Sequence, residues 1–280
     1  MEIKAADVKA LRDKTGAGMM ECKKALAECN GDEEKAIKLL KEKGLAAGAK
    51  RAERATKEGR IFIKEEGSKL VIAEVTCETD FVANNADFIA CGENIVNTAM
   101  AKGYTTITDE LKGLLDDFAA KTRENMGIRR LEMIEVPAGC VMSKYIHSDK
   151  KTGVVIVLKT EPASDDAKIK EFAYDCCLHI AAFNPAYIER KDVQQSYIDE
   201  QNEIFKAQLD QDPKMASKPD NVKAGILQGK LNKHLADICF MDQMFVKDDK
   251  VSVAKKLAEV AKSCGCTIKI EKVVNYVLGA

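Results

Sequence analysis

One stretch decides the fold: Lys69-Leu70-Val71-Ile72-Ala73-Glu74-Val75-Thr76-Cys77-Glu78-Thr79-Asp80-Phe81-Val82-Ala83-Asn84-Asn85. It begins with a short, β-branched and almost continuously apolar run, which predicts a largely buried strand. After it, apolar residues recur at three- and four-residue spacing from Phe88 to Met100, as they do on one face of a helix. Asn84 or Asn85 can cap that helix by accepting its free N–H groups. Residues 79–82 therefore lie on a strand-to-helix turn.

Two interpretations of this turn are open. Rigid elements on both sides would hold an acid, Asp80, and a large aromatic, Phe81, at the surface, where they could probe a partner. Alternatively, Phe81 packs against a residue one turn into the helix, while the negative charge of Asp80 only stabilises the positive N-terminal end of the helix. The spacing of the residues favours neither interpretation.

The sequence around this turn predicts the element order β-β-α-α-β. Upstream, Arg60–Lys64 alternates with period two and forms a hairpin with Leu70–Cys77. The helix after the turn runs to about Lys102, a second helix runs from its cap at Thr108 through Met126, and Ile128–Val136 returns to strand. This unit occupies residues 60–138.

The second half of the chain repeats the same order. It comprises a hairpin, a helix opened by Asp165 or Asp166, a later helix and a last strand, with the strands at Cys140–His147, Val154–Lys159 and Cys266–Glu271. The repeat predicts an α+β fold with two related subdomains, 60–138 and then 139–183 with 252–280. In each, helices cover one face of a small antiparallel sheet.

Residues 1–45 predict a bundle of three short helices. Glycine-containing turns separate the helices, and Gly44 is expected to end the third. A bundle this small buries little apolar surface, so a second role in docking is reasonable. Met19 and Met20 are adjacent and cannot both face one helix stripe, and their soft thioethers suit a partner surface. The alternative is that both are core residues at the start of a helix.

Two further segments complete the organisation. Residues 46–59 form a basic linker containing Lys50, Arg51, Arg54 and Lys57, for which a solvated face is favoured over contact with an acidic partner or RNA. Residues 184–251 form an insertion of two antiparallel helices, whose apolar faces need a cover.

Composition limits the functional classes. The chain has 280 residues, 44 Lys and Arg against 45 Asp and Glu, and a net charge of -1, so no overall field draws it to nucleic acid or a membrane. The N-terminus shows no signal segment, and no apolar run approaches the ~20 residues that span a bilayer. We expect a soluble cytoplasmic protein whose ten cysteines are mostly reduced.

Motifs for catalysis or cofactor binding are sparse. The three histidines show no metal-binding spacing, and Cys264 with Cys266 supplies only two of the ligands that a zinc site needs. No phosphate-binding loop of the G-x-x-x-x-G-K-[ST] type occurs, so we expect no direct nucleotide binding. A Cys-His pair formed by the fold stays open, but we expect no enzymatic activity, no cofactor and no metal.

Two long motifs stand in the order Arg12-Asp13-Lys14-Thr15-Gly16-Ala17-Gly18-Met19-Met20-Glu21-Cys22-Lys23-Lys24-Ala25-Leu26 and then Thr79-Asp80-Phe81-Val82. Both resemble the elongation factor Ts family, the nucleotide exchange factors of the GTPase elongation factor Tu. The similarity extends through His179-Ile180-Ala181-Ala182 and Gln243-Met244-Phe245-Val246-Lys247-Asp248-Asp249, where Met244 replaces a more usual proline.

The resemblance implies roles for particular residues. Phe81 would insert its ring into the GTPase, Asp80 would perturb the ligands and waters of Mg²⁺, and Thr79 and Val82 would fix the turn. His147 would press on the GTPase from another side, although an ordinary surface histidine is an equal alternative.

The resemblance also implies how larger segments act. The N-terminal bundle would be of the ubiquitin-associated type and would lie against the GTPase, with its contact residues at Leu11, Arg12, Met19 and Met20. Residues 184–251 would form a homodimerisation module. Two other classes are kept open: a module that only tethers its partners, and an RNA-binding protein that uses the basic run.

Overall fold

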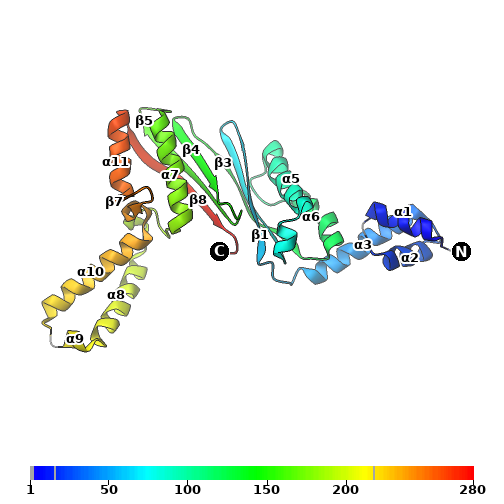
Figure 1. Ribbon diagram of the computed structural model, residues 1–280, viewed down its shortest axis with the longest axis horizontal. Helices are drawn as coiled ribbons and strands as arrows, with labels where there is room; N and C mark the ends of the chain where they lie inside the picture. Colours follow the sequence, from blue (N-terminus) through cyan, green and yellow to red (C-terminus); the bar gives the residue numbers. More distant parts are fainter. Residues whose placement is uncertain (1–2, 16, 217) are drawn as a thin grey trace. The chain divides into compact units, whose positions relative to one another are not determined.

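The computed structural model describes residues 3–15, 17–216 and 218–280, and side chains are described except at 44–51, 213 and 216. It is an α+β protein with three helices at the N-terminus followed by small sheets and helices (Figure 1). Contacts divide the chain into two compact units. The first comprises 1–136, 146–153 and 276–280, and the second comprises 137–145 and 154–275.

The N-terminal helices are α1 (Ala5–Thr15), α2 (Met19–Glu28) and α3 (Glu33–Arg51). Their core consists of the buried residues Val8, Leu11, Cys22, Ala25, Leu26 and Ala36. The three predicted helices are confirmed, but the prediction that Gly44 ends the third is wrong. A glycine inside a helix costs only about 1 kcal/mol relative to alanine, and the alanine-rich residues that follow favour continuation. Helix α3 therefore extends into the segment predicted as a linker.

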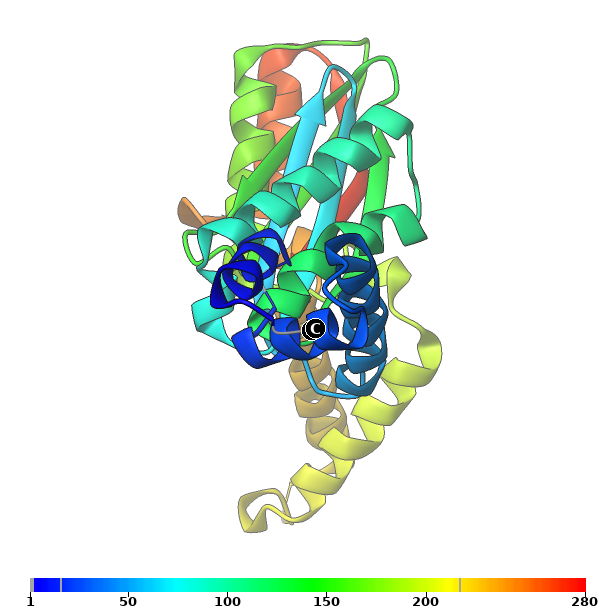
Figure 2. The ribbon, with the colours of Figure 1, turned by 90° about the vertical axis from the view of Figure 1, so that its right-hand side faces the viewer.

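The first unit is built on the antiparallel sheet β1-β2-β3, with β1 at Glu58–Glu66, β2 at Lys69–Cys77 and β3 at Met126–Glu135. Strand β2 is central and is buried along its length from Leu70 onward, as its apolar run predicts. Helices α5 (Ala86–Lys102) and α6 (Asp109–Thr122) cover one face, and Figure 2 shows α5 crossing the cyan strands.

Helix boundaries in this unit follow local capping. The side chains of Asn85 and Thr108 accept N–H groups at the starts of α5 and α6, as predicted. Helix α6 ends at Thr122 and not at the predicted Met126, because Met126 already pairs with Cys77 in the sheet. The turn after β2 forms an additional one-turn helix, α4 (Asp80–Ala83). The order β-β-α-α-β is otherwise confirmed.

The second half also has the predicted order. Strands β4 (Cys140–Ile146), β5 (Thr152–Glu161) and β8 (Thr267–Val277) form one sheet in the order β4-β5-β8, and helices α7 (Ala167–Phe183) and α11 (Val253–Cys264) share a core with it. Asp166 caps α7 through its carboxylate. Strand β8 extends to Val277, six residues beyond the predicted end.

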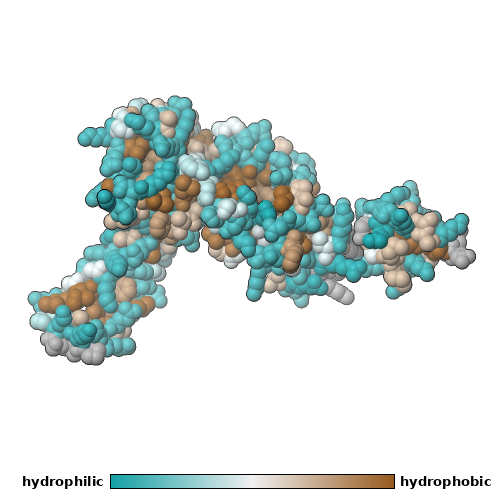
Figure 3. Space-filling view, viewed as in Figure 1, coloured by the Kyte–Doolittle hydropathy of each residue, from teal (hydrophilic) through white to brown (hydrophobic). Residues whose placement is uncertain are grey.

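The insertion contains the predicted helix pair, α8 (Gln195–Asp210) and α10 (Asp220–Ile238), with the short α9 (Pro213–Ala216) between them. Ile204 and Val222 are exposed there, and Figure 3 shows apolar side chains, in brown, on this helical segment. The 3₁₀ turns η1 (Arg190–Asp192) and η2 (Phe240–Asp242) flank the pair. A small hairpin of β6 (Met244–Phe245) and β7 (Asp248–Ser252) follows and was not predicted.

Two segments that the sequence assigned to the second subdomain pack on the first sheet. The N–H of Ile61 donates to the carbonyl oxygen of Lys150 at 2.8 Å, and the N–H of Leu278 donates to that of Lys151 at 2.8 Å. Gly153 fits against Ile61, because a Cβ at this glycine would lie only 2.5 Å from the Ile61 side chain. Residues 146–153, which include the turn between β4 and β5, and the C-terminal residues 276–280 therefore belong to the first unit.

None of the helices in the described part of the chain combines the length and the apolarity needed to cross a membrane.

Candidate functional site

The candidate site is the one-turn helix α4, which follows the central strand β2. Thr79 caps it: the hydroxyl oxygen of Thr79 accepts the N–H of Val82 at 3.3 Å, and its carbonyl oxygen accepts the N–H of Ala83 at 3.1 Å. These bonds redirect the chain from the strand into α5. The prediction that Thr79 and Val82 define the turn agrees with this geometry.

Phe81 projects from α4 into solvent, with 85% of its surface exposed. The alternative that its ring staples the helix by packing one turn further on is therefore wrong. The neighbouring Asp80 is also exposed, and its Oδ1 accepts the N–H of Phe81 at 3.0 Å. An exposed phenyl ring beside an exposed carboxylate forms the tip of the turn, which we call the Asp80–Phe81 tip.

Charged side chains from distant parts of the chain contact both ends of α4. Glu124, which lies between α6 and β3, accepts hydrogen bonds from Thr79, and Arg60 on β1 donates to the carbonyl oxygen of Ala83 at 2.6 Å. The sequence analysis missed both residues. No local signal points to them, because they lie 45 and 23 positions from their partners.

The turn between β4 and β5, within residues 146–153, belongs to the same compact unit as the tip. Lys151 forms an ion pair with Glu58, with 2.6 Å between Nζ and Oε2. The pKa of Lys151 is raised, chiefly by this hydrogen bond, and the negative charge of Asp80 contributes a smaller part. Asp80 is therefore within electrostatic range of this loop, which also carries the exposed His147. The structure thus places the predicted His147 in the same compact unit as the tip.

The N-terminal bundle carries the other predicted contact residues. Met19 is 43% and Met20 is 65% exposed, so the alternative that both are core residues is wrong. Arg12 is exposed as well. Leu11, in contrast, is completely buried in the core of the bundle, which corrects its predicted role as a contact residue. The side chains of Lys50 and Arg51, part of the predicted basic run, lie outside the described residues.

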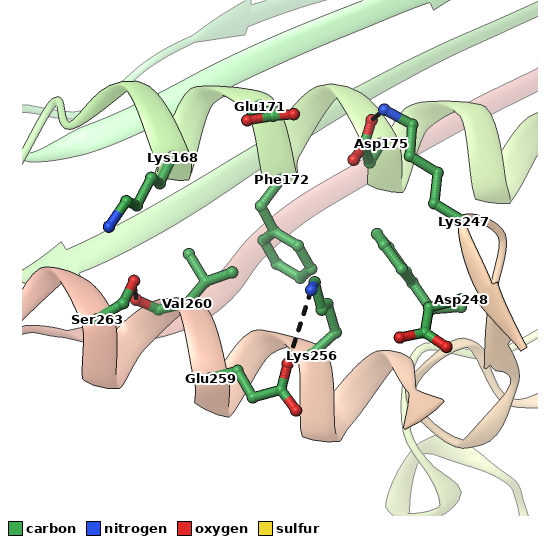
Figure 4. A pocket seen from close by; sticks show the side chains of 11 residues that line it. Lys168, Glu171, Phe172, Asp175, Lys247, Asp248, Lys256, Glu259, Val260 and Ser263 are labelled. Atoms are coloured by element: carbon green, nitrogen blue, oxygen red, sulfur yellow. Dashed lines mark hydrogen bonds and ion pairs between the residues drawn. The ribbon is translucent and has the colours of Figure 1, made fainter. Parts of the chain in front are cut away.

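A cavity of ≈ 500 Å³ lies in the second unit between α7 and α11 (Figure 4). Phe172 and Val260 line it, and ion pairs occupy its sides, with Nζ–Oδ1 at 2.6 Å for Lys247 with Asp175. Its lining contains neither histidine nor cysteine. Across the described residues, no group of three or more histidine, cysteine, aspartate or glutamate side chains is arranged to hold a metal. The Asp80–Phe81 tip therefore remains the candidate site.

Fold and site define a class of protein: an α+β scaffold that displays an acid and a phenyl ring on a braced turn, together with exposed methionines on a helical bundle. Exposed apolar side chains held in this way are typical of surfaces that bind other proteins. Comparison with known proteins gives the family. The sequence model described as Elongation factor TS matches residues 78–280.

Full-length relatives agree with this match. Elongation factor Ts of Treponema denticola is 57% identical over 281 residues, covering 100% of this chain and 99% of the relative. Elongation factor Ts of Treponema pallidum (strain Nichols) is 48% identical, with coverage of 100% and 99%, and that of Clostridium acetobutylicum is 38% identical, with coverage of 99% and 92%. The chain belongs to the elongation factor Ts family of translation elongation factors.

Proposed function

We propose that this chain is a guanine nucleotide exchange factor that binds elongation factor Tu in its GDP-bound form and promotes GDP release during translation elongation. The observation that carries the proposal is the Asp80–Phe81 tip, with its ring 85% exposed on a turn bonded at both ends. In this proposal the protein acts in the cytoplasm, catalyses no reaction of its own and needs no cofactor, metal or bound nucleotide.

The tip has the chemistry to disturb a phosphate and Mg²⁺ site. A GTPase holds its nucleotide through loop amides, a lysine and a Mg²⁺ ion that bridges phosphate oxygens and protein ligands. Phe81 inserts into an apolar pocket of the GTPase, where burying its ring contributes roughly 1.5–3 kcal/mol. Asp80 then lies close enough to compete for the water shell of the ion, because carboxylate oxygens are preferred ligands of Mg²⁺.

Thermodynamic reciprocity requires more contacts than this tip. If binding weakens nucleotide affinity by about 10⁴-fold, the nucleotide must weaken binding equally, a coupling of ~5.5 kcal/mol. One phenyl ring does not supply that energy. The exposed Arg12, Met19 and Met20 of the bundle and the loop with His147 are the further contact surfaces of the proposal.

The test replaces both tip residues, Asp80→Ala with Phe81→Ala, and follows release of a fluorescent GDP from elongation factor Tu by stopped flow. We expect accelerated release to be largely lost while the thermal stability changes little, because both side chains are exposed. Phe183→Ala is the matched control, since it removes another exposed phenyl ring, in the second unit. An unchanged release rate in the double variant would remove the tip from the mechanism. Binding of Tu without faster release by the unaltered chain would favour a tethering module.

Self-association through residues 184–251 remains a prediction. Ile204 and Val222 are exposed on the insertion, and a second copy of the chain bound there would cover them. Sedimentation at high concentration checks it, and a species of only 30.8 kDa would count against a dimer.

A further inference from the structure

We propose that Glu124 and Arg60 are positioning residues that aim the Asp80–Phe81 tip. The inference rests on the proposed exchange function, because aiming the tip matters only if the tip acts on a partner. Neither residue reaches the partner in this proposal. Each acts by holding one end of the four-residue helix α4.

Glu124 holds the start of α4 with both carboxylate oxygens. Oε2 accepts the N–H groups of Glu78 at 3.2 Å and Thr79 at 3.1 Å, and Oε1 accepts the hydroxyl of Thr79 at 2.7 Å. Because that hydroxyl donates to Glu124, its lone pairs face the N–H of Val82, which it caps at 3.3 Å. Hydrogen bonds to a charged acceptor are about twice as strong as neutral ones. One side chain thus sets both the backbone before Asp80 and the rotamer of the cap.

A second bond closes this contact in the opposite direction. Oε1 of Glu78 accepts the N–H of Asn125, the residue after Glu124, at 2.6 Å. The segments before α4 and before β3 therefore each present a carboxylate to the backbone of the other. This reciprocal arrangement prevents the start of α4 from sliding along the end of the sheet.

Arg60 holds the end of α4. Its Nε donates to the carbonyl oxygen of Ala83 at 2.6 Å, and its Nη2 donates to Oδ1 of Asn84 at 2.5 Å. Asn84 in turn donates through Nδ2 to the carbonyl oxygen of Asp80 at 2.8 Å. The planar guanidinium binds two acceptors at once, which a single ammonium group does not reproduce.

These bonds matter because the tip lies on a very short helix whose own bonds are few. A single helical turn is not stable alone, since isolated helices shorter than about 12–15 residues are marginal in water. Phe81 is exposed and gains no orientation from packing of its own ring. Without Glu124 and Arg60 the tip would sample a wider range of directions, and ordering it as the nucleotide site opens would cost free energy.

The experiment measures accelerated GDP release against the concentration of the exchange factor. We expect Glu124→Ala to lower the maximum rate of GDP release about tenfold, equivalent to ~1.4 kcal/mol. The half-saturating concentration should change less than about twofold, because contacts made only as the nucleotide site opens affect the maximum rate and not the initial binding. Glu124→Gln should recover most of the rate, since its carbonyl oxygen accepts both N–H groups and its amide donates to Thr79. Arg60→Lys should lose a few-fold, because the ammonium cannot bind both acceptors.

Glu135→Ala is the matched control. Glu135 lies at the opposite end of β3, paired with Lys69, whereas Met126 at the near end pairs with Cys77 beside the tip. Removing this exposed carboxylate changes the charge of the same unit by the same amount and should leave the release rate unchanged.

A second measurement reports on the tip without the partner. 4-Fluorophenylalanine is incorporated in place of phenylalanine, and the fluorine resonance of position 81 is assigned by its absence in Phe81→Ala. Glu124→Ala should shift and narrow this resonance, whereas Glu124→Gln and Glu135→Ala should not. If Glu124→Ala fails to fold, the fluorine resonance and the release rate of Arg60→Lys are compared with those of Glu124→Gln instead.

The outcomes separate the two proposals. If the unaltered chain does not accelerate GDP release, the proposed function fails. If it does and Phe81→Ala leaves the acceleration unchanged, the tip is removed from the mechanism and the positioning role is overturned with it, whatever the fluorine spectra show. If Phe81→Ala abolishes acceleration but Glu124→Ala exchanges at the rate of the unaltered chain, the positioning role is overturned. A parallel rise in the half-saturating concentration and fall in thermal stability would assign Glu124 a merely structural role and would overturn it as well.

Discussion

Replacing Glu74 should detach the C-terminal residues from the first sheet. Glu74 lies within β2 with no exposed surface. Its Oε2 accepts Nε of Arg130 at 2.6 Å, and its Oε1 accepts the N–H of Gly279 at 2.9 Å. Arg130 also donates to the carbonyl oxygen of Val277 at 2.7 Å and lies 4.1 Å from the ring centroid of Tyr276. One buried carboxylate therefore fastens the end of the chain.

The magnitude follows from burial of the two partners. Removing one member of a buried ion pair costs about 3–5 kcal/mol, because the other charge stays without a partner. The side chain of Arg130 keeps 30% exposure, so water can partly replace the lost carboxylate. We therefore expect Glu74→Ala to lower the free energy of unfolding of the first unit by ~3 kcal/mol, the low end of that range. Glu74→Gln keeps the volume and should cost ~2 kcal/mol, because hydrogen bonds to charged groups contribute roughly 1.5–3 kcal/mol.

Two measurements check this. Urea unfolding gives the loss of stability, and hydrogen exchange of the Gly279 amide reports the release of the chain end. The exposed Glu135→Ala is the control and should change stability by less than ~0.5 kcal/mol. A loss below ~1 kcal/mol in Glu74→Ala, which is within the range of an ordinary hydrogen bond, with the Gly279 amide still protected, would refute the reasoning.

Two further predictions concern packing and protonation. Gly92→Ala in α5 should cost about 2 kcal/mol or more in urea unfolding, because its Cβ would lie 2.1 Å from the buried ring of Phe62. Gly113→Ala in α6, where the Cβ would lie 3.9 Å from Oδ2 of Asp116, should instead stabilise by up to ~1 kcal/mol, and equal effects of both substitutions would contradict this. Burial lowers the pKa of His179 below its ordinary value of 6.5, against a smaller opposing effect of its hydrogen bond to Gln243. The unfolded chain then binds the proton first, so the free energy of unfolding should fall by up to ~1.4 kcal/mol per pH unit as pH drops below about 6.5 towards the folded pKa. If a His179→Asn variant shows the same dependence of unfolding free energy on pH between 7.5 and 5.5, His179 is not its source.

Local signals predicted the fold well because the interactions behind them span few residues. Asn85, Thr108 and Asp166 each cap the helix that follows. The sequence pattern pointed to Thr108 directly and narrowed the other two caps to the pairs Asn84 or Asn85 and Asp165 or Asp166. One helix end was misplaced because a distant strand decided the boundary. Helix α6 stops early because Met126 pairs with Cys77, a contact that no periodicity reveals.

The sequence by itself determined the order of elements, the strand-to-helix turn and the identity of its acid and aromatic residues, because alternation, helical spacing and capping are encoded within a few positions. The tertiary structure alone decided that Phe81 is exposed and that Leu11 is buried. It also decided that Glu124 holds Thr79 and that Gly279 bonds to Glu74 across 205 positions. Such long-range polar contacts form only when the chain folds back on itself, so residue spacing along the sequence carries no record of them.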